Sequence, residues 1–297
     1  MTGGWIERPE GGNRTALSLL TAIALSCGRA PARAILYAVA LYFQARRGAE
    51  RRASRDFLSR ALGRRVTALD VYRHVLCFSR VTLDRIFLLR RGTGGFAIRS
   101  SGLEQVHAAL EAGRGALMFG AHYGSYEALR ALSVHRPDLQ FRTVIDLGQA
   151  PAMSRLLDSL NPALAATIIN ARQPGTAVAL AIKDGLDRGA AVTLLADRTR
   201  PGGRTQTADF LGAPAPFPTA PWELATALGV PVILCFGTYE GGNRYHLQFE
   251  VLADRIVKER DGGPPIAAWV QRFADRLALR AGAAPFNWFN FYDFWSG

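Results

Sequence analysis

The chain has 297 residues, 49% of them hydrophobic, and a formal net charge of +12. This length and apolar content are enough for one large α/β domain or two small ones. Only Lys183 and Lys258 are lysines among the 36 basic residues. Arginine suits an anionic partner, such as membrane headgroups, an acidic carrier protein or nucleic acid, although a solvated basic surface has the same composition. The three cysteines form no CxxC pattern, which argues against disulfides and cysteine-bound metal and favours a reducing compartment.

The N-terminal segment, residues 1–47, is apolar and basic. Its two apolar runs, 16–27 and 35–43, are separated by a proline-containing break, and no acidic residue occurs between Ala16 and Gln44. Each run is shorter than the roughly 20 residues that a membrane-spanning helix needs. We therefore expect helices that lie in the membrane interface, with four arginines at the headgroups, namely Arg29, Arg33, Arg46 and Arg47. The alternative is two amphipathic helices packed on the domain. No signal-peptide cleavage site follows convincingly.

Helical and strand-like patterns alternate through the rest of the chain. In order, we expect helices over 49–65 and 68–89, a strand over 96–99, a helix over 101–112, strands over 115–121 and 141–145, a helix over 151–160, a strand over 166–169, a helix over 176–188, a strand over 190–196, a helix over 222–228, strands over 231–236 and 245–252, and a helix over 266–280. This alternation predicts an α/β fold with a β-sheet flanked by helices. The sheet should be mixed, because a hairpin turn at 240–243 joins the last two strands.

Several familiar catalytic motifs are absent or lie in the wrong context. Residues 92–97 formally match the dinucleotide fingerprint G-x-G-x-x-A, but a strand-like segment follows the turn where such a site requires a helix. Neither the G-x-S-x-G motif of esterases nor the H-E-x-x-H motif of metalloproteases occurs. Ser125 lacks a glycine elbow, so we expect it to be a loop or helix-cap residue.

The most informative segment is Gly120-Ala-His-Tyr-Gly-Ser-Tyr-Glu127, where a predicted strand gives way to a helix. The imidazole of His122 titrates near neutral pH and can take a proton from a hydroxyl group. The carboxylate of Glu127 can accept the other ring N–H and stabilise the imidazolium that forms. None of the other histidines has an acidic residue five positions downstream. The pair predicts acid–base chemistry, although a histidine that ends a strand and a glutamate that favours a helix N-terminus would have the same spacing.

A second predicted strand also ends in polar residues, at Asp197 and Arg198. In α/β sheets the chemistry gathers at the carboxyl ends of strands. We therefore expect this strand end and the one at His122 to lie at the same edge of the sheet. Loops rich in glycine and proline follow, over 201–204 and 210–218.

Three segments occur together in a familiar order, namely Phe119–Glu127, Leu195–Arg198 and Phe210–Ala225 followed by Gly229–Val232. The first contains an H-x4-D/E motif. The second is similar to a Pro-Asp-Gln motif, with Ala196 and Arg198 in place of Pro and Gln, and the third to a Phe-Phe-Gly motif, with Leu211 in place of the second Phe. Together they resemble the bacterial lipid A biosynthesis (lauroyl/myristoyl) acyltransferase family of the lysophospholipid acyltransferase superfamily. The resemblance extends from about Val66 to the C-terminus.

This resemblance implies a membrane-associated O-acyltransferase at the cytoplasmic face of the inner membrane. The enzyme would move a fatty acyl group from an acyl carrier protein or coenzyme A thioester to a hydroxyl group of a lipid or glycolipid, without a metal, a cofactor or an acyl-enzyme intermediate. Residues 48–297 would form the acyltransferase domain, with His122 as general base and Glu127 as the residue that orients it. Substrate contacts are expected from two arginines that could hold a phosphate group or the thioester oxyanion, and from two loop residues, namely Arg172, Arg198, Asp197 and Gly124.

Departures from the family pattern leave the acceptor open. Arg198 replaces a Gln, and Phe286–Trp295 is closer to the Trp-x-Asn-Phe-x-x-Phe-Trp ending of acyltransferase-like proteins in aryl-polyene pigment clusters. The alternatives are acylation of a glycerophospholipid or polyene pigment headgroup, and a non-catalytic membrane or nucleic-acid-binding protein that functions through the basic, Arg-rich helix expected over 49–65. Exposing so many aromatic side chains to water would be unfavourable. We therefore expect Trp288, Phe289 and Phe291 to be largely buried and to border an apolar groove near His122.

Overall fold

The computed structural model describes residues 14–111, 113, 115–129, 140–147, 161–200 and 202–295. Seven strands in these ranges form one sheet, namely β1 (Ala97–Ser101), β2 (Ala116–Gly120), β3 (Phe141–Ile145), β4 (Ile168–Asn170), β5 (Ala191–Leu195), β8 (Val232–Gly241) and β9 (Arg244–Ala253). Their order across the sheet is β1-β9-β8-β2-β5-β3-β4. The α/β fold predicted from the alternation of helices and strands is confirmed.

One hairpin makes the sheet mixed. β8 and β9 pair antiparallel and meet at a turn that contains Gly241 and Gly242, whose φ angles are 94° and 59°. β2 pairs parallel with both β5 and β8, and β9 runs parallel to β1. The hairpin predicted at 240–243 is thus the reason that the sheet has both orientations. Every residue of β2 is buried, as expected for a central strand that is covered on both faces.

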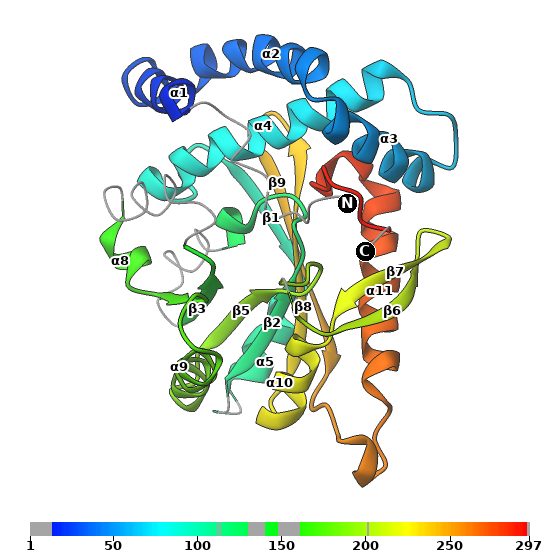
Figure 1. Ribbon diagram of the computed structural model, residues 1–297. Coiled ribbons are helices and arrows are strands. Elements are labelled where there is room, and N and C mark those ends of the chain that lie inside the picture. The colour runs from blue at the N-terminus through cyan, green and yellow to red at the C-terminus, as the bar shows by residue number, and fades with distance from the viewer. Residues whose placement is uncertain are drawn as a thin grey trace.

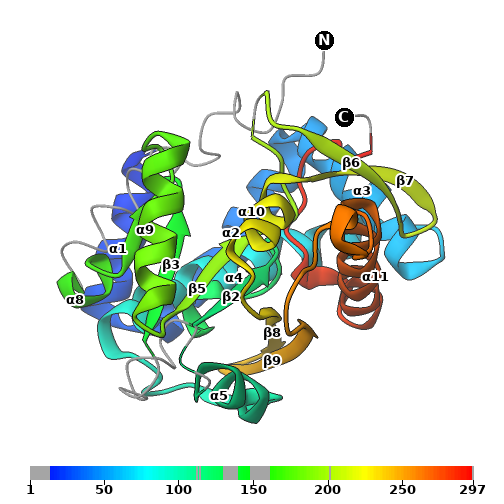
Figure 2. The ribbon, with the colours of Figure 1, turned by 90° about the horizontal axis from the view of Figure 1, so that it is seen from below.

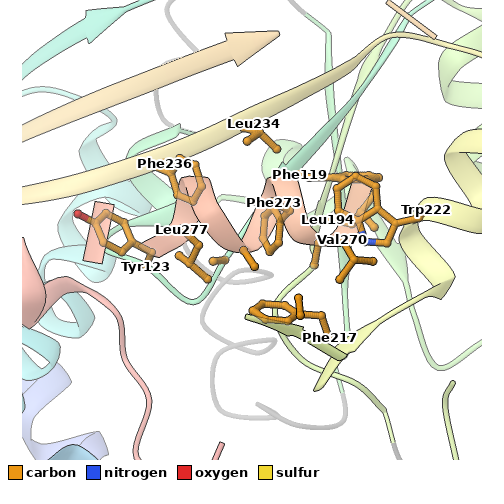
Figure 3. Packing of buried hydrophobic residues seen from close by; sticks show 14 of the residues in the cluster. Phe119, Tyr123, Leu194, Phe217, Trp222, Leu234, Phe236, Val270, Phe273 and Leu277 are labelled. Atoms are coloured by element: carbon orange, nitrogen blue, oxygen red, sulfur yellow. The ribbon is translucent and has the colours of Figure 1, made fainter. Parts of the chain in front are cut away.

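Helices cover both faces of the sheet, as Figures 1 and 2 show. One face packs against α9 (Gly175–Asp187), α10 (Ala220–Leu228) and α11 (Ile266–Ala283), and the other against α4 (Ala68–Arg91) and α5 (Leu103–Glu111). Figure 3 shows the core of the first face, where strand residues such as Phe119 and Leu234 lie opposite Phe273 and Leu277 of α11. These layers hold the ends of the central strands in fixed positions.

Local sequence explains where two helices meet. α3 (Gly48–Leu62) ends before Gly63, which adopts the left-handed conformation with φ 62°. The basic helix is therefore shorter than the predicted 49–65. α4 begins with a capping box, in which the side chain of Thr67 accepts the N–H of Asp70 at 3.2 Å and the carboxylate of Asp70 accepts the N–H of Thr67 at 2.9 Å.

The N-terminal helices α1 (Arg14–Cys27) and α2 (Arg29–Arg46) lie over α4, on its side away from the sheet (Figure 1). Arg29 donates to both carboxylate oxygens of the buried Asp84 at 2.7 Å, and Arg33 lies 3.8 Å from the same group. These two guanidinium groups supply the charged partner that a buried carboxylate needs, so they face the domain. The expectation that Arg29 and Arg33 meet lipid headgroups is therefore wrong. Among the described residues, no helix is long and apolar enough to cross a membrane.

A second, two-stranded sheet lies in a region expected to be loop. β6 (Thr205–Phe210) and β7 (Ala213–Pro218) pair antiparallel beside α11 (Figure 1). The prolines of β7 fall on alternate positions, so their missing N–H groups all face one edge of the strand and leave the other edge able to pair. The short elements α8 (Pro162–Ala165), η1 (Glu259–Asp261) and η2 (Pro285–Asn287) complete the fold. The helix predicted over 151–160 lies outside the described residues.

Candidate active site

The central strands β2 and β5 end side by side at one edge of the sheet. Their parallel register places Gly120 beside Leu195, and the N–H of Ala196 donates to the carbonyl of Gly120 at 2.9 Å. His122 and Asp197 follow directly, and Nδ1 of His122 lies 2.8 Å from Oδ1 of Asp197. The prediction that these two strand ends share an edge is confirmed.

Asp197 is fully buried and accepts three N–H groups. Its Oδ1 faces the imidazole, while Oδ2 accepts the backbone N–H of His122 at 3.0 Å and the indole N–H of Trp288 at 3.1 Å. Burial favours the neutral acid, but the interactions with His122 and Arg198, including the hydrogen bonds from His122, outweigh it and hold the pKa of Asp197 below its usual range. The group is therefore a carboxylate that only accepts, so Nδ1 of His122 carries the hydrogen.

His122 has the properties of a general base. Its side chain is 30% exposed, so a substrate can reach it, although the rest of the ring is closely surrounded by protein. This burial lowers the pKa of the imidazole, and Arg198 and Arg85 lower it further, against the opposing effect of Asp197. A lowered pKa keeps the ring neutral at pH 7. Because Nδ1 carries its hydrogen, Nε2 is the nitrogen that can accept a proton.

Glu127 does not hold the position at Nδ1 that the five-residue spacing suggested. That position belongs to Asp197, because the pairing of β2 with β5 brings its side chain there. Glu127 is 5% exposed, and its Oε2 forms an ion pair with Nε of Arg85 on α4 at 2.9 Å. A catalytic role for Glu127 stays a prediction.

The loop after His122 depends on a glycine and a serine. Gly124 has φ 58°, and a Cβ atom there would collide with the carbonyl oxygen of Gly237 on β8. The side chain of Ser125 accepts the N–H of Ala128 at 3.1 Å and caps the helical turn that follows. The prediction of a cap role for Ser125 is confirmed. Gly124 allows the loop to approach the sheet, and its role in substrate binding stays a prediction.

The C-terminal aromatic segment pairs with this loop. The N–H of Phe289 donates to the carbonyl of His122 at 2.8 Å, and the N–H of Gly124 donates to the carbonyl of Asn287 at 2.7 Å. Trp288 is 0% exposed and Phe289 is 8% exposed, as predicted. Phe291 is half-buried. The expected proximity of the segment to His122 is confirmed, whereas an apolar groove there stays a prediction.

Comparison with known protein families now adds to this geometry. The family model of the bacterial lipid A biosynthesis acyltransferases matches residues 84–296, a range that contains His122, Asp197 and Trp288. The chain belongs to this family. It is therefore an acyltransferase, and the family implies transfer of an acyl group to a lipid. A search of curated proteins found no match.

The two arginines predicted to bind substrate in this acyltransferase lie at different positions. Nη2 of Arg198 donates to the carbonyl of Phe289 at 2.6 Å, which ties the arginine to the C-terminal segment. Arg172 is exposed just beyond β4, three strands along the sheet from β2. At ~4.8 Å per strand, this corresponds to about 14 Å. Arg198 is the better placed of the two to act near His122.

Sequence reasoning missed three parts of this candidate site. Asp197 was expected to be a loop residue that contacts the substrate and not the partner of His122, although an acidic residue directly after a buried strand was a usable signal. Arg85 was given no role, because nothing in the sequence connects it with Glu127. Trp288 lies 91 residues after Asp197, and no local pattern indicates their contact. In the part of the chain that the structure describes, no group of three or more His, Cys, Asp or Glu side chains could hold a metal ion.

Proposed function

We propose that this acyltransferase moves a fatty acyl group from an acyl thioester to a hydroxyl group of a lipid or glycolipid. His122 acts as general base, and Asp197 orients it and stabilises the imidazolium. The observation that carries the proposal is the 2.8 Å contact between Nδ1 of His122 and Oδ1 of Asp197, which leaves Nε2 as the proton acceptor.

The proposed reaction is a direct displacement. As the acceptor oxygen attacks the thioester carbonyl carbon, its proton passes to Nε2 of His122 and negative charge develops on the carbonyl oxygen. The carbon–sulfur bond then breaks, and the imidazolium returns the proton to the leaving sulfur. The products are an ester and a free thiol, and the step needs no metal, cofactor or acyl-enzyme intermediate. Arg198 and Arg85, whose charges lower the pKa of His122, are suited to stabilise the oxyanion.

A basic hollow on α3 supports an acidic carrier protein as the acyl donor. It has a volume of about 920 Å³, and its lining includes Arg52, Arg55 and Arg65. Among the described residues, none of these three guanidinium groups lies within 4.0 Å of a carboxylate, whereas Asp56 in the same lining pairs with Arg60. Carboxylates of a carrier protein would supply the missing negative charge and steer its approach.

The outer face of α2 supports attachment to a membrane surface. Its large exposed side chains are apolar or aromatic, namely Ile35, Tyr37, Leu41 and Tyr42, with Leu41 exposed by 60%. The charged Arg29 and Arg33 of the same helix face the domain, so they do not interrupt this surface. An apolar helix face bounded by Arg46 suits the boundary between headgroups and acyl chains. We infer that α2 lies in the cytoplasmic face of the inner membrane.

The central experiment is acyl transfer by His122→Ala. Loss of a general base should slow the transfer of an acyl group from acyl carrier protein to a lipid acceptor by about 10²–10⁴-fold. His246→Ala is the matched control, because His246 lies on β9 and, among the described residues, its ring hydrogen-bonds a surface serine, Ser101. Normal turnover in a folded His122→Ala variant contradicts the proposal.

Two further variants test which carboxylate acts on His122. Asp197→Asn keeps the shape but removes the charge that stabilises the imidazolium, so it should slow transfer more than Glu127→Gln does. Circular dichroism and thermal melting confirm that both variants are folded before rates are compared. If Glu127→Gln is the slower enzyme, Glu127 and not Asp197 is the catalytic carboxylate.

A further inference from the structure

The indole of Trp288 completes the hydrogen bonding of the Asp197 carboxylate. Trp288 is 0% exposed, and its Nε1–H donates to Oδ2 of Asp197 at 3.1 Å. Among the described residues, the same oxygen accepts one other donor, the backbone N–H of His122, while Oδ1 accepts the N–H of the imidazole. Without the indole N–H, Oδ2 would keep the backbone N–H of His122 alone of these two donors, and the carboxylate would be held less firmly in its alignment with Nδ1.

The ring of Trp288 is itself held in a tight aromatic cage. Phe57 of α3, Phe210 of β6 and Phe294 surround it edge-on, with ring centroids 4.8, 5.1 and 4.9 Å away. These contacts fix the plane of the indole and therefore the direction of its N–H. Because packing already fixes its orientation, the indole N–H loses little conformational entropy when it forms its hydrogen bond.

His74 holds the backbone of Trp288 in place. Nε2 of this buried histidine lies 2.9 Å from the carbonyl oxygen of Trp288, and Nδ1 lies 2.7 Å from Oγ of Ser54. A carbonyl oxygen only accepts, so Nε2 carries the hydrogen and Nδ1 accepts the hydroxyl of Ser54. Both ring nitrogens are occupied, and the ring stacks on Phe291 at 4.5 Å. His74 therefore holds the C-terminal segment and has no nitrogen left for chemistry.

We propose that Trp288 is a positioning residue for acyl transfer: its indole N–H holds the Asp197 carboxylate in the orientation that receives Nδ1–H of His122, and His74 holds Trp288 in place. The proposal rests on the proposed function of His122 as general base. It makes the C-terminal aromatic segment part of the catalytic apparatus as well as part of the core. Hydrogen bonds to charged groups contribute enough that losing this one should lower kcat by about 10-fold to 100-fold.

The sharpest test replaces Trp288 with 3-benzothienylalanine, which keeps the size and shape of indole but has no N–H. We expect kcat to fall about 10-fold or more with KM unchanged, because the substrate does not touch Trp288. A carboxylate that loses its alignment with Nδ1 stabilises the imidazolium less, so the pKa of His122 should fall and the acid limb of the pH–rate profile should move to lower pH. Trp288→Phe should show the same changes if it folds.

Trp222→Phe is the matched control. Trp222 is also 0% exposed and packs in the same core cluster (Figure 3), but its Nε1 has no hydrogen-bond partner among the described residues. This variant should be less stable than the wild type, but the acid limb of its pH–rate profile should be unchanged. The proposal is overturned if the benzothienyl protein has wild-type kcat and pH profile, or if Trp222→Phe shifts the acid limb as far.

A measurement without substrate separates this proposal from the proposed function. In protein labelled with ¹⁵N-histidine, the ring nitrogen shifts of His122 report which nitrogen carries the hydrogen. We expect a single Nδ1–H form in the wild type and a mixture of both forms in the benzothienyl protein. An unchanged single form overturns the proposal, whereas a mixture together with an active His122→Ala variant would overturn only the role of His122 as base.

Discussion

The two ends of this acyltransferase are both rich in apolar side chains but have opposite surroundings. At the C-terminal end, Trp288 is 0% exposed, whereas on α2 near the N-terminal end Leu41 is 60% exposed. Both ends are anchored on the same helix, α4, one through His74 and the other through Asp84. Burial thus depends on whether other side chains pack against the segment. Aromatic rings of the core surround Trp288, whereas no part of the described chain packs against the outer face of α2. Apolar composition alone does not distinguish a core segment from a candidate membrane surface.

The largest expected effect comes from removing the C-terminal end. A chain that stops at Ala284 loses Trp288 and Phe294, both fully or almost fully buried in the main core cluster. Burying one large side chain contributes roughly 1.5–3 kcal/mol, so losing several should exceed the stability of a typical domain. We expect no cooperative thermal transition in this truncated protein. A truncated chain that melts like the full chain would show that the segment is only peripheral.

The next largest loss of stability should come from breaking the ion pair between Arg29 of α2 and Asp84 of α4. Arg29→Ala leaves the carboxylate of Asp84, which is 0% exposed, without its bidentate partner. Breaking a buried ion pair typically costs about 3–5 kcal/mol, and the remaining contacts with Arg33 and Tyr245 should keep this variant near the lower value. Urea denaturation measures the change. Arg46→Ala, in the last turn of the same helix, should change stability by less than about 0.5 kcal/mol.

His74, which holds the C-terminal segment on α4, should also make the stability of the protein sensitive to acid. Burial lowers the pKa of His74 from 6.5 to about 4. Between these values the unfolded chain binds more protons than the folded protein, so stability is complete above pH 6.5 and falls as the pH drops towards 4. The loss from this group should reach on the order of 3 kcal/mol. His74→Phe should flatten this part of the curve of unfolding free energy against pH, and an equally steep curve in the variant would exclude His74 as the cause.

A substitution on the outer face of α2 should have the smallest effect on stability but a large effect on membrane binding. Leu41→Glu changes an exposed side chain, so unfolding should shift by less than about 0.5 kcal/mol. The added charge should nevertheless weaken binding to vesicles that contain anionic lipids, measured by co-sedimentation. Leu180→Glu on α9 is the control, because Leu180 is 67% exposed on another element. Equal sedimentation of both variants and the wild type would mean that α2 is not the attachment surface.

Much of the fold could be predicted from the sequence. β3 was predicted with its observed bounds, and β2, β5, α9 and α11 within a few residues, because period-2 and period-3.6 patterns are local properties of the chain. The same locality explains why polar residues after two buried strands indicated the edge of the sheet where His122 and Asp197 lie. The family also followed from short motifs in order.

Tertiary structure alone decided which groups meet. His122 and Asp197 are 75 residues apart, and only the parallel pairing of β2 with β5 places them in contact. Glu127, five residues from His122, instead pairs with Arg85 of α4. Arg29 and Arg33 were expected at headgroups and are bound by Asp84 and by groups near the β8–β9 turn. A local pattern specifies the direction of a strand or the face of a helix, whereas the partner of a buried charge depends on which distant segment packs there and removes the water around it.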